Sequence, residues 1–212
     1  MVTYLIIAAV SLVSISAFSN REVYSKLMFN PYKIKHSNQW YRFVSHAFIH
    51  ANWEHLIFNM LTLYFFGIFV EVAFAHNFGS KAIPLYISEF VLAFIVSSIP
   101  SYFKHKDNYA YNAVGASGAV SAILYTSILF EPLNKIYLFF IPIGIPAFVF
   151  GIIYLAYSAY MSKRNTDNIG HDAHFWGAVF GFAFPLIFRP QLFSEFISIV
   201  KNYFWLWLKQ YF

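Results

Sequence analysis

Long runs of apolar residues alternate with short polar stretches along most of this chain. Each run is close to the ~20 residues that a helix needs to cross the hydrocarbon core of a bilayer. We predict spans near residues 2–18, 55–75, 82–101, 115–130, 144–161 and 173–188. The pattern indicates an all-α integral membrane protein, in which residues 1–189 form one compact bundle of six transmembrane helices.

Two stretches outside these runs have the mixed composition of a membrane–water interface. Residues 19–54 form one long connection with five Lys or Arg residues. Its aromatic residues include Trp40, Tyr41, Phe43, Phe48 and Trp53. Residues 190–212 place apolar side chains at helical spacing with Lys201 and Lys209 between them. We predict an interfacial loop and a C-terminal interfacial helix, with a seventh span as the alternative for the latter.

Composition supports a membrane location and narrows the chemistry. Hydrophobic residues make up 59% of the chain and charged residues 11%, which is too few for the surface of an ordinary soluble domain. Basic residues facing anionic lipid headgroups explain the net charge of +5, and no basic run suggests a nucleic-acid partner. The chain has no cysteine, so a cysteine nucleophile is excluded.

The fourth apolar run is short and opens with Gly-Ala-Ser-Gly-Ala at residues 115–119. Residues 115–130 would make a helix of about 24 Å at ~1.5 Å per residue, shorter than the ~30 Å hydrocarbon core. Such a helix can begin below the membrane surface if the irregular backbone before it lines a water-filled cavity. We therefore expect Ser117 to lie at a cavity floor, with small neighbours that leave its hydroxyl accessible.

The sixth run carries a histidine on a stripe of glycines. His174, Gly177 and Gly181 share one helical face because they are three and seven residues apart. A stripe of small residues permits a close helix crossing, and residues 115–122 offer a partner that is also rich in small residues. Such a crossing would bring His174 against Ser117.

The polar residues of three runs suggest acyl-transfer chemistry. The second, fourth and sixth runs begin on the same membrane face, so His55 and Asn59 should lie at the depth of Ser117. Buried polar groups that converge in a membrane mark a functional site. His174 can deprotonate Ser117, and His55, Asn59 and a backbone N–H can stabilise the oxyanion. Asp172 points to another helix face, so we expect a Ser–His dyad and no triad.

The chain resembles a rhomboid intramembrane serine protease from about Tyr41 to Gly181. The resemblance rests on His-x4-His-x3-Asn at residues 50–59, Gly-x-Ser-Gly at residues 115–118 and Ala-His-x2-Gly-x3-Gly at residues 173–181. Each motif alone is weak, but the three occur in the expected order and on the expected runs.

The resemblance implies a fold, an activity and the roles of four residues. The fold is the six-helix rhomboid bundle, with Ser117 as nucleophile, His174 as general base, and His55 with Asn59 in the oxyanion hole. The helix near 144–161 would act as a substrate gate. The implied substrates are transmembrane helices of other proteins in the lipid bilayer, cut near their extracytoplasmic end in the cell (inner) membrane. No cofactor and no metal are implied.

Several positions depart from the family pattern or mark a boundary. Ser121 stands where bacterial members commonly carry a tyrosine that packs on the catalytic histidine, which leaves open what orients His174. Tyr41 replaces the usual tryptophan before Arg42 and keeps an aromatic ring at the interface. The two prolines and the glycine of residues 142–146 are expected at the start of the fifth helix, with a gating hinge as the alternative.

Other polar residues are expected to have structural roles. We predict that His46 and His50 hold the loop backbone together. Arg42 should bind backbone carbonyl groups, with an interfacial lipid contact as the alternative. Glu71 and Glu89 lie within apolar runs, where a carboxyl group is costly enough to need hydrogen-bond partners.

Two other functions stay open at this point. The histidine pairs His46/His50 and His171/His174 suggest a membrane metalloenzyme, because histidine is the commonest metal ligand, although no His-Glu-x-x-His helix is present. A catalytically inactive rhomboid-like protein that binds transmembrane segments is the second alternative. The presence of both Ser117 and His174 argues against it.

Overall fold

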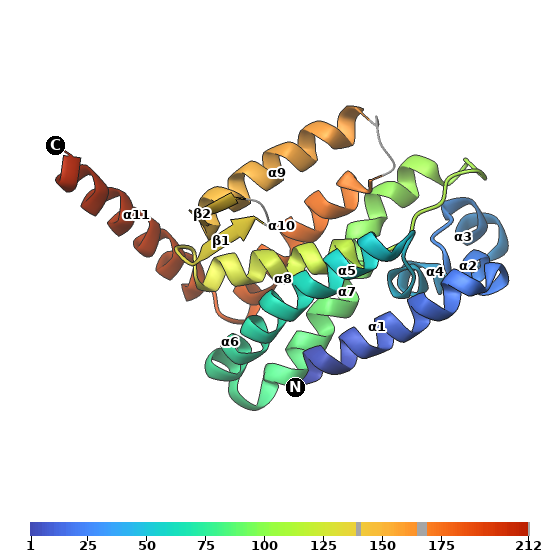
Figure 1. Cartoon of the computed structure of the whole chain (residues 1–212), viewed down its shortest axis with the longest axis horizontal. Helices are drawn as coiled ribbons and strands as arrows, with labels where there is room; N and C mark the ends of the chain where they lie inside the picture. Colours follow the sequence, from blue (N-terminus) through green and yellow to red (C-terminus); the bar gives the residue numbers. More distant parts are fainter. Residues whose placement is uncertain (139–140, 165–168, 212) are drawn as a thin grey trace.

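The computed structural model describes residues 1–138, 141–164 and 169–211 and is mostly helical (Figure 1). The helices before the Gly-Ala-Ser-Gly run are α1 (Val2–Ser19), α2 (Arg21–Leu27), α3 (Pro31–Ser37), α4 (Arg42–Ser45), α5 (Trp53–Thr62), α6 (Ile68–Phe78) and α7 (Ala82–His105). The later helices are α8 (Ser117–Phe130), α9 (Ala147–Arg164), α10 (His171–Phe188) and α11 (Gln191–Tyr211). Short turns of other helix types are η1 (His46–Phe48), the π-helical η2 (Leu63–Gly67) that joins α5 to α6, and η3 (Gly79–Lys81).

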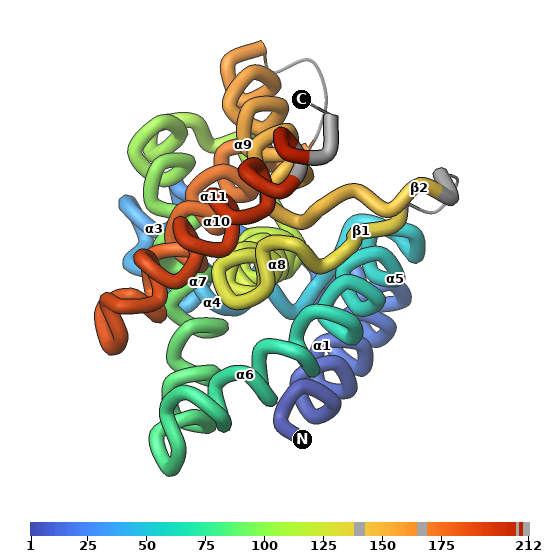
Figure 2. Tube along the Cα trace, turned by 90° about the vertical axis from the view of Figure 1, so that its left-hand side faces the viewer, coloured from blue at the N-terminus to red at the C-terminus, as the bar shows by residue number. Residues whose placement is uncertain are grey.

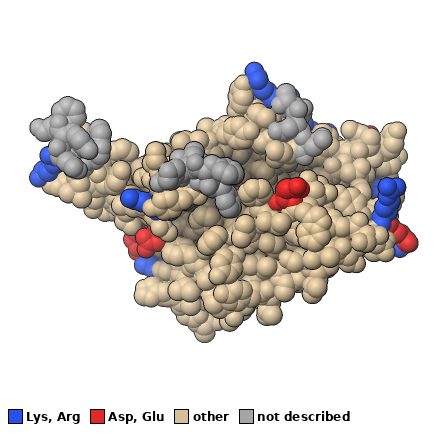
Figure 3. Space-filling model, viewed as in Figure 1, with Lys and Arg blue, Asp and Glu red and all other residues tan. Residues whose placement is uncertain are grey.

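Two helical stretches of the described chain are long and apolar enough to cross a membrane, Val2–Ser19 and Trp53–His105. The second stretch reverses direction between α6 and α7 (Figure 1). In that connection, Gly79 has a φ of 56°, in the left-handed region that glycine adopts readily. A third span exists if α10 and α11, which are bent by 118°, count as one. Lys, Arg, Asp and Glu are sparse on the face drawn in Figure 3. The protein is therefore an integral membrane protein.

Helix α8 lies at the centre of the bundle (Figure 2). Almost all of its side chains are buried, and it contacts the surrounding helices α5, α6, α7, α9, α10 and α11. A helix with neighbours on all sides has no face to turn toward water, which explains why it is apolar all round. This packing fixes the position of its N-terminal residue, Ser117, relative to the surrounding helices.

The prediction of an all-α chain is wrong in one place. Strands β1 (Lys135–Leu138) and β2 (Ile141–Pro146) form an antiparallel hairpin in which Lys135 lies opposite Pro146. The prediction that residues 142–146 open the fifth helix is wrong as well, because α9 begins at Ala147. The physical reason is local: alternating β-branched isoleucines favour a strand, and proline is tolerated where both strands are edges.

Glu71 has the structural role that the sequence predicts. Its carboxylate accepts hydrogen bonds from the backbone N–H groups of Val2 (2.7 Å) and Thr3 (3.0 Å) and from the Thr3 hydroxyl (2.7 Å). The first N–H groups of a helix have no partner within the helix, and a carboxylate is favourable at that end of the helix dipole. Glu71 thus caps α1 and joins it to α6.

Candidate active site

The backbone before α8 is held by the loop that precedes α5. Gly115 N–H donates to the carbonyl of His46 (2.9 Å), and Ala113 and Phe29 exchange two backbone hydrogen bonds. Gly115 has a φ of 115°, and a Cβ there would lie 2.6 Å from the ring of His55. Glycine is therefore required at residue 115, because another residue would be strained at this φ and its Cβ would collide with the ring of His55. This turn delivers Ser117 to the first position of α8.

His50 fixes the same turn from the other side. Its Nδ1 lies 2.8 Å from Ser14 Oγ, and its Nε2 lies 3.4 Å from the backbone N of Ala116. The Ser14 hydroxyl donates to the carbonyl of Phe48 (2.9 Å), so Ser14 Oγ accepts a hydrogen bond from the Nδ1–H of His50. Nε2 is then the acceptor for Ala116. A neutral His50 therefore positions the residue immediately before Ser117.

The two loop histidines are both neutral for physical reasons. Burial lowers the pKa of His46 to about 4, against the effect of the Arg42 carbonyl 2.8 Å from its Nδ1. Burial, with a smaller effect of the neighbouring His55, lowers the pKa of His50 to about 3. Their contacts confirm that His46 and His50 hold loop backbone together.

Arg42 is almost fully buried and binds backbone carbonyl groups, as predicted. Its Nη1 donates to the carbonyls of Ser25 (3.1 Å) and Met28 (2.5 Å), and its Nε donates to Gln39 Oε1 (2.7 Å). The guanidinium thereby closes the segment between α2 and α4. Burial lowers the pKa of Arg42 from its ordinary value, and the group still carries its charge at any physiological pH.

Helix α10 packs against α8 through glycine. A Cβ at Gly177 would overlap the carbonyl of Gly118, and one at Gly181 would overlap the carbonyl of Ala122. At the start of the crossing, a Cβ on Gly118 would lie 3.5 Å from the carbonyl of Ala173. The close crossing predicted from the small-residue stripe is confirmed.

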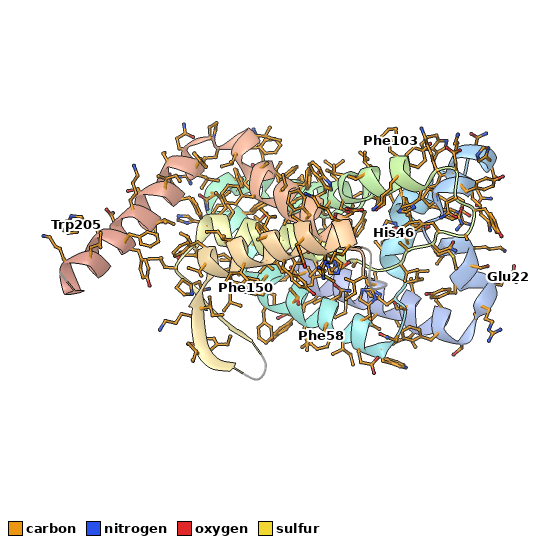
Figure 4. All side chains as sticks on the ribbon, turned by 90° about the horizontal axis from the view of Figure 1, so that it is seen from above. Glu22, His46, Phe58, Phe103, Phe150 and Trp205 are labelled. Atoms are coloured by element: carbon orange, nitrogen blue, oxygen red, sulfur yellow. The ribbon has the colours of Figure 1, made fainter. Side chains whose placement is uncertain are left out.

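A cavity of about 680 Å³ opens beside this crossing and contains three of the predicted site residues, Ser117, His174 and Asn59. Its walls are largely apolar and include Phe58 of α5 and Phe150 of α9, which Figure 4 labels. Ser117 and His174 are both half-buried, whereas Asn59 is 6% exposed. The structure thus brings an alcohol, an imidazole and an amide from α8, α10 and α5 to one cavity.

His55, the fourth predicted site residue, is not among the residues that line the cavity. Its ring packs against Gly115 and lies 4.9 Å from the ring of His50. Asn59 Nδ2 donates to the backbone carbonyl of His55 (3.1 Å), which leaves its second N–H available because a primary amide has two.

Asp172 contacts neighbouring helices at the start of α10. Its carboxylate accepts from Ser162 Oγ of α9 (2.5 Å) and from Lys104 Nζ of α7 (3.5 Å). These two contacts agree with the expectation that Asp172 faces away from the imidazole of His174.

One contact of His174 has no counterpart among the predictions from sequence. The ring of Tyr154 in α9 stacks on it with centroids 6.2 Å apart and planes at 25°. The Tyr154 hydroxyl lies 2.8 Å from Ser121 Oγ. The only sequence signal was indirect: a small serine at residue 121 leaves room beside the histidine for a ring from another helix.

The histidine-ligated metalloenzyme finds no support in the arrangement of side chains. Within residues 1–138, 141–164 and 169–211, no three His, Asp or Glu residues are grouped so that they could hold a metal ion. His46 and His50 are instead engaged with backbone groups and Ser14.

Comparison with known proteins points to one family. The model of the rhomboid domain matches residues 37–191. RHOMBOID-like protein 12, mitochondrial, from Arabidopsis thaliana is 30% identical over 159 residues, 67% of this chain and 44% of the relative. Rhomboid-like protein 11, chloroplastic, from the same plant is 38% identical over 42% of this chain and 29% of the relative.

A bacterial relative is also similar to this chain. Rhomboid protease AarA from Providencia stuartii is 28% identical over 48% of this chain and 38% of the relative. The chain thus spans less than half the length of each of these relatives. The family model nevertheless covers the cavity, the α8–α10 crossing and all four predicted site residues, and the chain belongs to the rhomboid family.

Proposed function

We propose that the protein is a serine endopeptidase that hydrolyses peptide bonds in or near transmembrane helices of other membrane proteins. The observation that carries the proposal is the shared cavity of Ser117 and His174 at the start of α8 and α10. One relative, rhomboid protease AarA, bears a name that agrees with it.

The reaction needs a nucleophile, a base and donors to the oxyanion. His174 accepts the proton of Ser117 as the Oγ attacks the scissile carbonyl, and it later returns that proton to the leaving amine. Water then hydrolyses the acyl-enzyme with His174 again as base. The free N–H of Asn59, His55 and the backbone N–H of Ser117 stabilise the tetrahedral oxyanion. No cofactor enters these steps.

For the membrane topology, we propose six spans and an interfacial C-terminal helix. The spans are α1, α5 with α6, α7, α8, α9 and α10, which assigns residues 1–189 to the rhomboid-like membrane domain with its interfacial loop 19–54. Helix α11 would form the separate segment 190–212. Supporting this division, α11 is bent by 118° from α10, and its exposed side chains include Phe193, Phe204 and Trp205.

The orientation follows from this topology. With the N-terminus cytoplasmic, α8 and α10 begin on the extracytoplasmic side, and the cavity opens there. A cell (inner) membrane is the proposed location, and the mitochondrial and chloroplastic relatives make organelle membranes the competing one. Substrates should have small or helix-breaking residues at the cut, because a peptide bond inside a helix is shielded from attack until it unwinds.

A fluorophosphonate probe and a model transmembrane substrate test the activity. Purified protein in lipid should be labelled and should cleave the substrate, whereas Ser117→Ala and His174→Ala should do neither. Retained cleavage by Ser117→Ala that a chelator abolishes would instead indicate a metalloenzyme. If the folded wild type binds a transmembrane peptide but shows neither labelling nor cleavage, the protein is an inactive rhomboid-like binder.

A further inference from the structure

The plane of the His174 ring decides whether His174 can act as a base. The imidazole lies half-buried beside a cavity, and the nearest carboxylate in sequence, Asp172, bonds to Ser162 and Lys104. A base works only when its nitrogen is held within hydrogen-bond reach of the proton that it removes. Among the described residues, the ring of His171 in the same helix lies edge-on to the imidazole with centroids 5.9 Å apart, and the ring of Tyr154 in α9 stacks on it.

Tyr154 of α9 has the required geometry. Its ring is nearly parallel to that of His174, at 25° and 6.2 Å between centroids. An offset stack of this kind is favourable for aromatic pairs and restricts rotation of the imidazole. The Tyr154 hydroxyl is in turn 2.8 Å from Ser121 Oγ, which lies one helical turn after Ser117. One side chain thus contacts the helices of both the nucleophile and the base.

Tyr154 is itself held in place from its own side of the cavity. The ring of Phe150, one turn earlier in α9, stacks on it at 5.8 Å and 28°. Tyr125 of α8 lies 6.0 Å away and donates its hydroxyl proton to the carbonyl of Gly151. These contacts fix both the ring of Tyr154 and the helix that carries it.

We propose that Tyr154 is the positioning residue that orients His174 toward Ser117, a role that rests on the proposed peptidase function. Because Tyr154 belongs to α9, the orientation of the base depends on where α9 packs. A movement of α9 away from α8 would release the imidazole as well as widen the cavity.

Four variants of the full-length protein in lipid test the proposal. Tyr154→Leu removes the ring, whereas Tyr154→Phe and Ser121→Ala each remove only the hydroxyl contact. Tyr160→Leu is the matched control, since Tyr160 is an exposed tyrosine of the same helix. The measurements are the rate of fluorophosphonate labelling between pH 5 and pH 9, kcat and KM for a transmembrane substrate, and the thermal unfolding midpoint.

We expect Tyr154→Leu to lower the labelling rate and kcat by about 10- to 100-fold, to shift the pH midpoint of labelling and to leave KM nearly unchanged. Tyr154→Phe and Ser121→Ala should each cost only several-fold, and Tyr160→Leu should behave as the wild type. A merely structural role would lower the unfolding midpoint without moving the pH profile of the folded fraction.

Each other outcome is decisive as well. Labelling of Tyr154→Leu at the wild-type rate and pH profile would overturn the role of Tyr154, while leaving the peptidase activity intact. If Tyr154→Leu does not fold, Tyr154→Phe, Ser121→Ala and the variant with both changes decide. Equal slowing in the two single variants, with no further slowing in the double variant, supports the contact between the Tyr154 hydroxyl and Ser121. Wild-type labelling by both single variants overturns the role proposed for that contact. A wild type that is not labelled at Ser117 refutes the proposed function itself.

Discussion

Gly177 of α10 packs directly on the backbone carbonyl of Gly118 in α8, with no room for a Cβ between the two helices. Backbone atoms in such contact cannot yield as a flexible side chain can, so an added methyl group must separate the helices. Because Ser117 and His174 stand at the start of this crossing, separation would also disturb the site.

Gly177→Ala should therefore reduce both stability and activity. Overpacking of a well-packed site costs about 1–3 kcal/mol, and we expect a lower thermal unfolding midpoint together with slower fluorophosphonate labelling. Gly170→Ala is the control, because within the described part of the chain a Cβ there would meet only the Cβ of Ala173 at 3.8 Å. Equal unfolding midpoints for the two variants would show that the crossing is looser than the structure has it.

Glu89 and Thr126 form a second buried contact with a definite protonation. Thr126 Oγ1 lies 2.7 Å from the carbonyl of Gly181 and also contacts Glu89 Oε1, which is fully buried. A hydroxyl has one proton and a carbonyl can only accept. Both contacts can be hydrogen bonds at once if Thr126 donates to the carbonyl of Gly181 and a protonated Glu89 donates to Thr126. Such a bonded carboxyl group agrees with the structural role predicted for Glu89.

We predict that Glu89→Gln keeps the unfolding midpoint, because an amide N–H can replace the carboxyl O–H. Glu89→Ala should lower the stability by about 1–3 kcal/mol, since it leaves Thr126 without its donor and opens a cavity. Thermal unfolding in one detergent, compared among the three proteins, measures this. A loss in Glu89→Gln as large as that in Glu89→Ala would mean that Glu89 is needed as an ionised carboxylate.

The lowered pKa values of His46 and His50 should make the stability of the protein depend on pH. The unfolded chain binds protons at His46 and His50 below about pH 6.5, whereas the folded chain does so only near pH 4 and pH 3. The contribution of these two histidines to the free energy of unfolding is therefore fully present above about pH 6.5, and it is lost as the pH falls from there toward the pKa values of the folded chain. Protonation of either ring in this window therefore favours the unfolded chain.

Unfolding midpoints measured from pH 7.5 to pH 4 test this dependence. The wild type should lose stability toward pH 4, and His50→Asn should show a shallower slope from a lower starting point. His36→Asn should keep the wild-type slope, because His36 is exposed. An unchanged slope in His50→Asn would mean that His50 is not buried in the neutral form. Protonation of His50 should also slow labelling, because Nε2 could no longer accept from Ala116.

Sequence could predict the parts of the site that local spacing determines. The Gly-Ala-Ser-Gly run fixes the start of α8, and the three- and four-residue spacings place His174 above the glycines that meet α8. The distance between Ser117 and His174 follows from how the helices cross, and their hydrogen bond stays a prediction.

Other features depend on relationships that no spacing encodes. Tyr154 reaches His174 because of the way α9 is rotated about its axis where it packs against α8 and α10. In the sequence, a tyrosine within an apolar run cannot be distinguished from an ordinary core residue. The hairpin of β1 and β2 was missed for a different reason. Its few alternating isoleucines and prolines are too short a pattern to separate a strand from the first turn of a helix.

The hydrogen bonds of Arg42 lead to a prediction about the stability of the loop of residues 19–54. Arg42→Lys keeps the charge but cannot reach Gln39 and two carbonyls at once, because an ammonium group lacks the planar fork of a guanidinium. At least one of these three partly buried oxygens then loses its charged donor, at a cost of about 1–3 kcal/mol. Since the same loop holds Gly115 through the His46 carbonyl, labelling should also slow.

Limited trypsin digestion measures this effect, because a lysine at residue 42 preserves the cleavage site. Digestion between residues 20 and 52 should be faster in Arg42→Lys than in the wild type, as expected when a segment opens locally. Arg21→Lys, an exposed position in α2, is the matched control and should be digested at the wild-type rate. If Arg42→Lys resists trypsin as well as the control, the carbonyl contacts of Arg42 do not hold the loop, and an interfacial lipid contact becomes the better account of its charge.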